Sequence, residues 1–86
     1  MRGITRKNKD HAGGLLITGS PTVFANDHPV VRLLDRVAPH GKRRHRSAYI
    51  ITTSPDVYVN NIKTCRQGDL ANCGHIATGS SNVFVN

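Results

Sequence analysis

Four histidines and one cysteine are the residues of this sequence whose chemistry points most directly to a function. The set is His11, His40, His45, Cys73 and His75. Imidazole nitrogens and a thiolate are ligands that Zn²⁺ takes in tetrahedral structural sites, at about 2.0–2.1 Å for nitrogen and about 2.3 Å for sulfur. No compact C-x-x-C or H-x-x-x-H pair is present. The spacing alone therefore also fits a simpler interpretation, surface histidines in a basic loop.

A ten-residue segment that occurs three times gives these residues a common frame. The copies, called the repeat segments below, are ITGSPTVFAN, ITTSPDVYVN and ATGSSNVFVN, at residues 17–26, 51–60 and 77–86. The first two copies start 34 residues apart, and so do His11 and His45. These two histidines therefore hold the same position ahead of successive copies, while Cys73 and His75 precede the third copy.

A pseudo-threefold arrangement of the three copies would bring these residues together near one end of the axis. His40, from the longer stretch before the second copy, then completes a set of three imidazoles and one thiolate with His11, His45 and Cys73. This set suits a tetrahedral Zn²⁺ site, which we favour over iron. His75 is an alternative to His40, or else a surface residue or a partner that orients a ligand.

The repeats predict an all-β fold, a single domain over residues 1–86 built from short β-hairpins. Val, Phe, Tyr, Thr and Ile dominate the short runs, and no stretch has a sustained apolar period of 3.6 residues. We expect strands of about five or six residues and tight turns with positive φ at Asn26-Asp27 and Asn60-Asn61. Residues 31–36, VRLLDR, are expected to end a strand, with one helical turn as the alternative. The third copy lacks the continuation that follows the other two, so we count two and a half repeats.

Within the repeats, two ion pairs and one buried thiol are also expected. Arg32 should pair with Asp35 and Arg66 with Asp69, as exposed pairs worth about 0–1 kcal/mol. Cys65 aligns with an apolar strand position of the first repeat, which predicts a small buried core side chain.

Length and composition limit the core and suggest partners. A chain of 86 residues with two Phe, two Tyr, one Met and no Trp can bury only a thin core, so a metal ion or a partner protein is expected to stabilise it further. No apolar signal segment precedes the first repeat, so we expect synthesis in the cytoplasm, without disulfides. The net charge of +7 would attract nucleic acid, anionic lipid or an acidic protein surface.

Several of these motifs, in this order, resemble the PAAR-repeat proteins, which cap the central spike of type VI secretion systems and contractile phage tails. GSPTVFAN and GSSNVFVN are similar to the GSPNVFVNG of that family, and HPVVR at 28–32 stands where the family has its P-A-A-R tetrad. DHAGG at 10–14 matches the first histidine, PHGKRRHR at 39–46 the two-histidine insert, and ANCGH at 71–75 the cysteine motif. The resemblance covers nearly the whole chain.

The resemblance implies a cone of hairpins with zinc near its tip, held by three histidines and one cysteine, which by position are His11, His40, His45 and Cys73. It implies a structural role: one cap on a trimeric spike with a β-helical shaft, in brief contact with a target membrane. Because residue 86 completes the third repeat segment, any effector cargo is expected to bind noncovalently. Whether the machine is a phage tail or a secretion system stays open, as do the residues that dock the spike.

Two other functions are less consistent with the sequence. Cys73, His75 and Asp69 could in principle form a thiol site, but nucleophilic catalysis needs an oriented base in a cleft, which short hairpins leave little room for. The alternative function is a small basic zinc module that binds nucleic acid through Lys42, Arg43, Arg44 and Arg46. The sequence offers it no recognition helix and few aromatic side chains for stacking.

Overall fold

The computed structural model describes residues 1–39 and 48–86, and this part of the chain is all-β, as predicted. It contains no helix, and so none that could span a lipid bilayer. The strands are β1 (Arg2–Gly3), β2 (Phe24–Ala25), β3 (His28–Pro29), β4 (Tyr58–Val59), β5 (Ile62–Lys63) and β6 (Phe84–Val85). Each has two residues, so the expected strand length of five or six residues is wrong. Beyond the two paired residues, each chain segment pairs with a segment of another strand pair through isolated bridges, such as Ile4 with Arg66 and Arg32 with Thr64. This change of partner keeps every strand short.

Two of the three strand pairs are hairpins closed by two-residue turns. β2 pairs with β3 and β4 with β5, both antiparallel. The turn residues have positive φ, 52° and 67° at Asn26 and Asp27, and 55° and 64° at Asn60 and Asn61. Asn and Asp tolerate this left-handed region better than most residues, and the tight turns of hairpins require it. Both predicted turns are confirmed.

The third strand pair joins the two ends of the chain. β1 lies antiparallel to β6, with Arg2 opposite Val85 and Gly3 opposite Phe84, which reproduces the register of the β2–β3 pair. Nothing follows the third repeat segment along the sequence, as expected, but the N-terminal strand takes the place of the missing continuation. Three strand pairs therefore form where the sequence has two and a half repeats. Comparison along the sequence missed this strand because it precedes every copy of the repeat.

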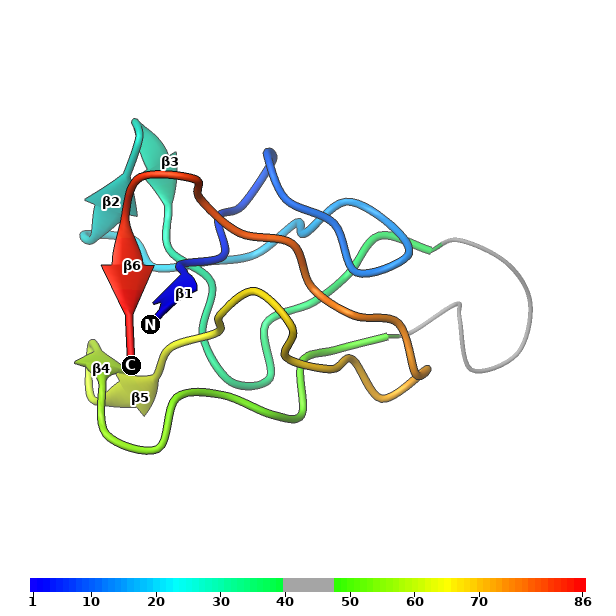
Figure 1. Ribbon diagram of the computed structural model, residues 1–86. Helices are drawn as coiled ribbons and strands as arrows, with labels where there is room; N and C mark the ends of the chain where they lie inside the picture. Colours follow the sequence, from blue (N-terminus) through cyan, green and yellow to red (C-terminus); the bar gives the residue numbers. More distant parts are fainter. Residues whose placement is uncertain (40–47) are drawn as a thin grey trace.

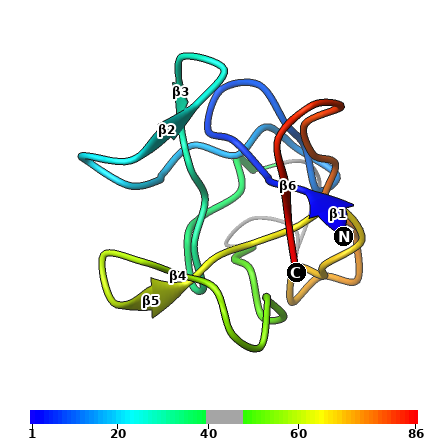
Figure 2. The ribbon, with the colours of Figure 1, turned by 60° about the vertical axis from the view of Figure 1, so that its left-hand side comes forward.

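The segments that follow β1, β3 and β5 meet at the centre of the molecule. The N–H of Thr5 donates to the carbonyl of Cys65 at 3.1 Å, that of Cys65 to Val31 at 2.9 Å, and that of Val31 to Thr5 at 2.9 Å. All three residues are fully buried. These bonds form a closed hydrogen-bonded ring, and the three strand pairs lie around it (Figure 2).

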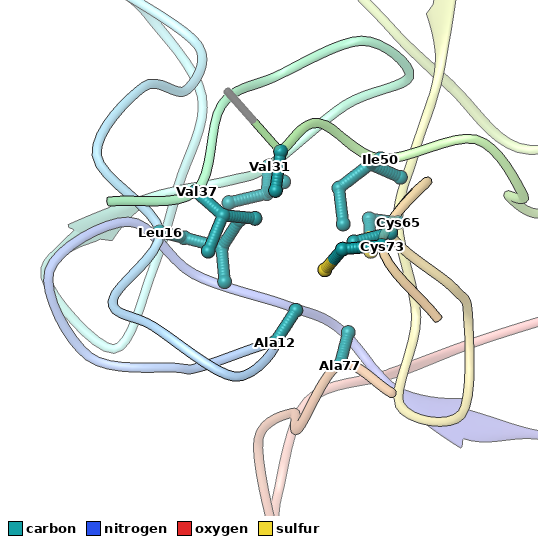
Figure 3. Packing of buried hydrophobic residues seen from close by; sticks show 10 residues of the cluster. Ala12, Leu16, Val31, Val37, Ile50, Cys65, Cys73 and Ala77 are labelled. Atoms are coloured by element: carbon teal, nitrogen blue, oxygen red, sulfur yellow. The ribbon is translucent and has the colours of Figure 1, made fainter. Parts of the chain in front are cut away.

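The molecule is elongated, with extents of 32 × 23 × 23 Å. The three strand pairs lie at one end, the hairpin end, and the long loops reach the other, the loop end (Figure 1). Small and medium side chains such as Leu16, Val37, Ile50 and Cys65 fill the core between the loops (Figure 3). The described core contains no buried aromatic side chain, consistent with the thin core that the composition predicts.

Residues 31–36 make a turn and not a helix. The backbone bridges at Arg32 and then turns at residues 33–34, with Leu34 at φ 70°. The helical alternative for this stretch is therefore wrong.

A Gly3→Ala substitution tests the pairing of β1 with β6. A Cβ at this position would lie 2.0 Å from the carbonyl oxygen of Ser80, so β1 must move away from the third repeat segment. We expect the free energy of unfolding, measured by urea titration, to fall by about 2–4 kcal/mol. Gly74→Ala is the control, since nothing lies within 4 Å of its Cβ and only its positive φ adds a cost, of about 1 kcal/mol. Equal losses in the two variants would contradict the pairing.

Candidate metal centre

His11 is held at the loop end by its backbone. Its N–H donates to the hydroxyl oxygen of Thr78 at 3.0 Å, and its carbonyl accepts the N–H of Thr78 at 2.9 Å. The residue is exposed. A backbone fixed at two points, with an accessible imidazole, is suited to metal binding.

Cys73 lies in a tight turn at the same end. The N–H of Ala71 donates to the carbonyl of His75, and the N–H of Gly74 donates to that of Ala71, both at 2.9 Å. Gly74 permits the turn with a φ of 93°. Cys73 is only 3% exposed, and its sulfur points into the middle of the apolar cluster (Figure 3). The neighbouring His75 is exposed.

Further hydrogen bonds join the segments on both sides of residues 40–47 to these two loops. The N–H of Ala38 donates to the carbonyl of Leu15 at 2.7 Å, and the N–H of Asn72 donates to that of Tyr49 at 2.8 Å. The N–H of Tyr49 in turn donates to the side-chain oxygen of Asn72 at 3.0 Å. The described segments that end at residue 39 and resume at residue 48 therefore lie beside the loops that carry His11 and Cys73 (Figure 1).

Two of the four expected ligands, His40 and His45, lie outside the described residues, together with Lys42, Arg43, Arg44 and Arg46. Residues 1–39 and 48–86 alone contain no group of three His, Cys, Asp or Glu side chains that could hold a metal ion. The loops that carry His11, Cys73 and the alternative ligand His75 lie at the loop end (Figure 1), but these three side chains do not by themselves form a group that could hold a metal ion. Imidazole and thiol donors there fit Zn²⁺, whereas the full ligand set, and the matching positions of His11 and His45, stay predictions.

Cys65 is not suited to metal binding, although it is the other thiol of the chain. It is fully buried in the core, which confirms the expectation of a core side chain. Burial raises the pKa of its thiol to about 12. A metal ligand must be a thiolate, so Cys65 acts as a small apolar residue.

Three Arg–Asp pairs surround the hydrogen-bonded ring. The distances from Nε to Oδ2 are 2.8, 3.3 and 3.0 Å for Arg6–Asp10, Arg32–Asp35 and Arg66–Asp69. Each carboxylate also accepts the backbone N–H of its own arginine, at 2.6–2.8 Å. A threonine hydroxyl of a repeat segment donates to the other carboxylate oxygen at 2.8–3.0 Å, from Thr78, Thr18 and Thr52 respectively.

The sequence predicted two of these pairs and missed the third. The pairs of Arg32 with Asp35 and of Arg66 with Asp69 are confirmed, but they are not exposed, since the two aspartates are 8% and 2% accessible. The Arg6–Asp10 pair was not predicted because its members are four positions apart, and not three as in the other two pairs, and because the pair precedes the first repeat segment. The order Ile-Thr-Arg at 4–6, which resembles Thr-Cys-Arg at 64–66, was the available signal.

The environment of Asp69 favours its ionised form. Burial by itself raises the pKa of this carboxyl, but the hydrogen bonds from the side chain and backbone of Arg66 and from Thr52 outweigh it, so the pKa lies below its usual value. The same bond to Asp69 raises the pKa of Arg66. Both groups stay charged at neutral pH, and the carboxylate orders the turn between them.

Comparison with known proteins adds one finding. A family model described as the PAAR motif matches residues 7–74, most of the chain. No curated protein matches it.

Asp69 is expected to make stability depend on acid. A carboxyl whose pKa is lowered by folding contributes stability that is present above the unfolded value, about 3.9, and is lost as the pH falls through the folded value. Asp69→Asn should lower the free energy of unfolding at pH 7 by about 3 kcal/mol, because the charge of Arg66 is left without its partner. The variant should also show a shallower loss of stability below pH 4 in thermal melts.

Asp27→Asn is the matched control for Asp69→Asn, because Asp27 is exposed in a turn whose counterpart in the second hairpin is Asn61. It should leave both quantities nearly unchanged. An acid profile of the Asp69 variant identical to that of the unmodified chain would rule out this role for the carboxylate.

Proposed function

Because the chain belongs to the PAAR-motif family, we propose that it is a spike-tip protein, which caps the trimeric β-helical spike of a contractile injection machine and sharpens it for membrane piercing. The resemblance to this family implies association with spike tips and a structural rather than an enzymatic role, and we propose both for this chain. The proposed role of this chain is therefore mechanical: the chain forms a small rigid point at the end of the shaft.

The hydrogen-bonded ring is the observation that carries this proposal. Three strand pairs of matching register lie around Thr5, Val31 and Cys65, which supports a pseudo-threefold arrangement. One chain with three similar faces can meet three identical subunits, which a cap without internal repetition cannot do equally well. The hairpin end then faces the shaft, where it covers strand edges that would otherwise stay unpaired.

We further propose that the loop end binds one Zn²⁺ through His11, His40, His45 and Cys73, with His75 as the alternative to His40. When bound, the ion would supply a cross-link between the loops in addition to their shared apolar cluster. Four protein ligands would leave no open position for water, as in other structural zinc sites. The backbone bonds of His11 and the tight turn of Cys73 reduce the freedom of these ligands before the ion arrives.

The proposed cap also has consequences for other partners. We propose that the tip contacts the target membrane only briefly, during piercing, and must be stiff at that moment. The three buried ion pairs support this stiffness because they favour one conformation over its alternatives. Nucleic acid is not a proposed partner.

Metal analysis of the purified chain tests the zinc proposal. We expect one zinc per chain, and a chelator should lower the melting temperature because zinc binding and folding are coupled. Alanine at position 11, 40, 45 or 73 should each abolish stoichiometric zinc, whereas His75→Ala and the control His28→Ala should retain it. Zinc lost in the His75 variant but kept in the His40 variant would make His75 the ligand. A chain with no bound transition metal and an unchanged melting temperature in chelator would refute the site.

Binding to a trimeric spike tests the proposed function itself. The purified chain, mixed with the trimeric β-helical spike protein of the organism that encodes it, should form a complex of one chain per trimer by mass photometry or sedimentation. Duplex DNA at the same ionic strength should not bind comparably. No complex with the spike, or three chains on each trimer, would contradict the role of a cap.

A further inference from the structure

Three large aromatic side chains lie on the surface at matching positions of the three strand pairs. Phe24, Tyr58 and Phe84 are the first residues of β2, β4 and β6, and they are 57%, 56% and 49% exposed. The next residues in β2 and β4, Ala25 and Val59, are only 6% and 7% exposed. Each aromatic therefore stands on the outer face of its strand pair while its neighbour packs inward.

This exposure is unusual for a chain so poor in large apolar residues. The sequence has only two Phe and two Tyr, and three of these four side chains are on the surface at equivalent places while the core is filled by smaller residues. An aromatic side chain gains more from burial than most others and dominates the energetics of many protein interfaces. Burial by a partner explains why these three are not used in the core.

Polar bonds between neighbouring strand pairs hold the aromatic residues on a stiff support. The hydroxyl of Ser80 donates to the side-chain oxygen of Asn26 at 2.8 Å, and the amide of Asn26 donates to Asn82 at 2.9 Å. The hydroxyl of Ser20 donates in the same way to Asn60, whose amide donates to Thr22 at 2.8 Å. A surface that is already ordered loses little conformational entropy when it binds.

The charges of the surface bear on how the partner is recognised. Three of the five acids, Asp10, Asp35 and Asp69, are buried against arginines, which leaves Asp27 and Asp56 exposed in a chain of net charge +7. Arg2 and Lys63 lie on β1 and β5, and Lys63 is directly opposite Tyr58. Asp27 and Asp56 also lie beside the strand pairs, so charges of both signs surround the aromatic side chains. The partner is therefore recognised by apolar contacts rather than by its net charge.

We propose that Phe24, Tyr58 and Phe84 are the anchors by which the chain docks on its partner, a homotrimer whose end presents three identical apolar sockets. The inference rests on the proposed function and names the residues that carry it out. Three equal anchors on one chain match three equal sites, one on each subunit. A second copy of this chain would meet it through a twofold interface, in which three equivalent anchors cannot all be used alike.

Tyr58 makes one of the three contacts different from the others. Identical sockets that accept phenylalanine at two positions must also accept a phenol at the third, so its hydroxyl should lie at the wet rim of the socket, where water can satisfy it. Tyr58→Phe should therefore keep the affinity within about twofold. Tyr58→Ser should reduce the affinity as much as Phe24→Ser or Phe84→Ser does.

Affinity measurements with the trimeric β-helical spike protein of the source organism test the inference. Phe24→Ser, Tyr58→Ser and Phe84→Ser should each raise Kd at least about tenfold, and the triple variant should lose binding. Ile76→Ser is the matched control, because Ile76 is 61% exposed but lies outside the strand pairs, and it should leave Kd unchanged. Melting temperatures should be the same in all variants, since none of these side chains is in the core.

The outcomes separate this inference from the proposed function. A wild-type chain that binds one per trimer, with serine variants that bind equally well, would overturn the anchors and leave the cap intact. A wild-type chain that binds no trimer would overturn both. Sedimentation of the chain alone provides the remaining test, because a dimer that disappears in the triple variant would show that a second copy of this chain covers the aromatic residues.

Discussion

A closed circuit of three backbone hydrogen bonds, through Thr5, Val31 and Cys65, is the constraint on which the structure depends. Buried N–H and carbonyl groups must find partners inside the protein, and strands of two residues cannot satisfy them within one hairpin. Instead, each of the three segments donates a backbone hydrogen bond to the next around the ring. If one segment unfolded, buried polar groups of the other two would lose their partners, so we expect this small domain to unfold cooperatively.

Buried polar groups take the place of the apolar volume that the chain lacks. Every carboxylate beside the ring accepts an arginine Nε–H, a backbone N–H and a threonine hydroxyl. Among the described residues no buried side-chain nitrogen or oxygen lacks a hydrogen-bond partner. Such pairs add little stability over an apolar core, but breaking one of them is costly. The result is a body that resists deformation.

Much of the architecture was predictable from the sequence, and the exceptions have physical causes. The Asn-Asp and Asn-Asn turns, the all-β class and the burial of Cys65 follow from local residue chemistry and from the alignment of copies. The short strands were not predictable, because composition indicates β structure but not where a ladder changes partner. The pairing of Arg2–Gly3 with β6 could not be predicted because the two strands lie at opposite ends of the sequence. For the candidate metal site, the donors could be named from the sequence, and the loops that carry them lie at one end of the molecule (Figure 1). The described residues alone form no group of three donors.

The pairing of β1 with β6 also dictates when the fold can form. Its residues lie more than 80 positions apart, and closing so long a loop costs roughly 2 kcal/mol more entropy than closing one ten times shorter. The two local hairpins can assemble early, whereas the third pair must wait for both of its strands. During synthesis the residues of the ring, Thr5, Val31 and Cys65, are all made before Phe84 and Val85. The pairing of β1 with β6 is therefore the last of the three strand pairs that can form.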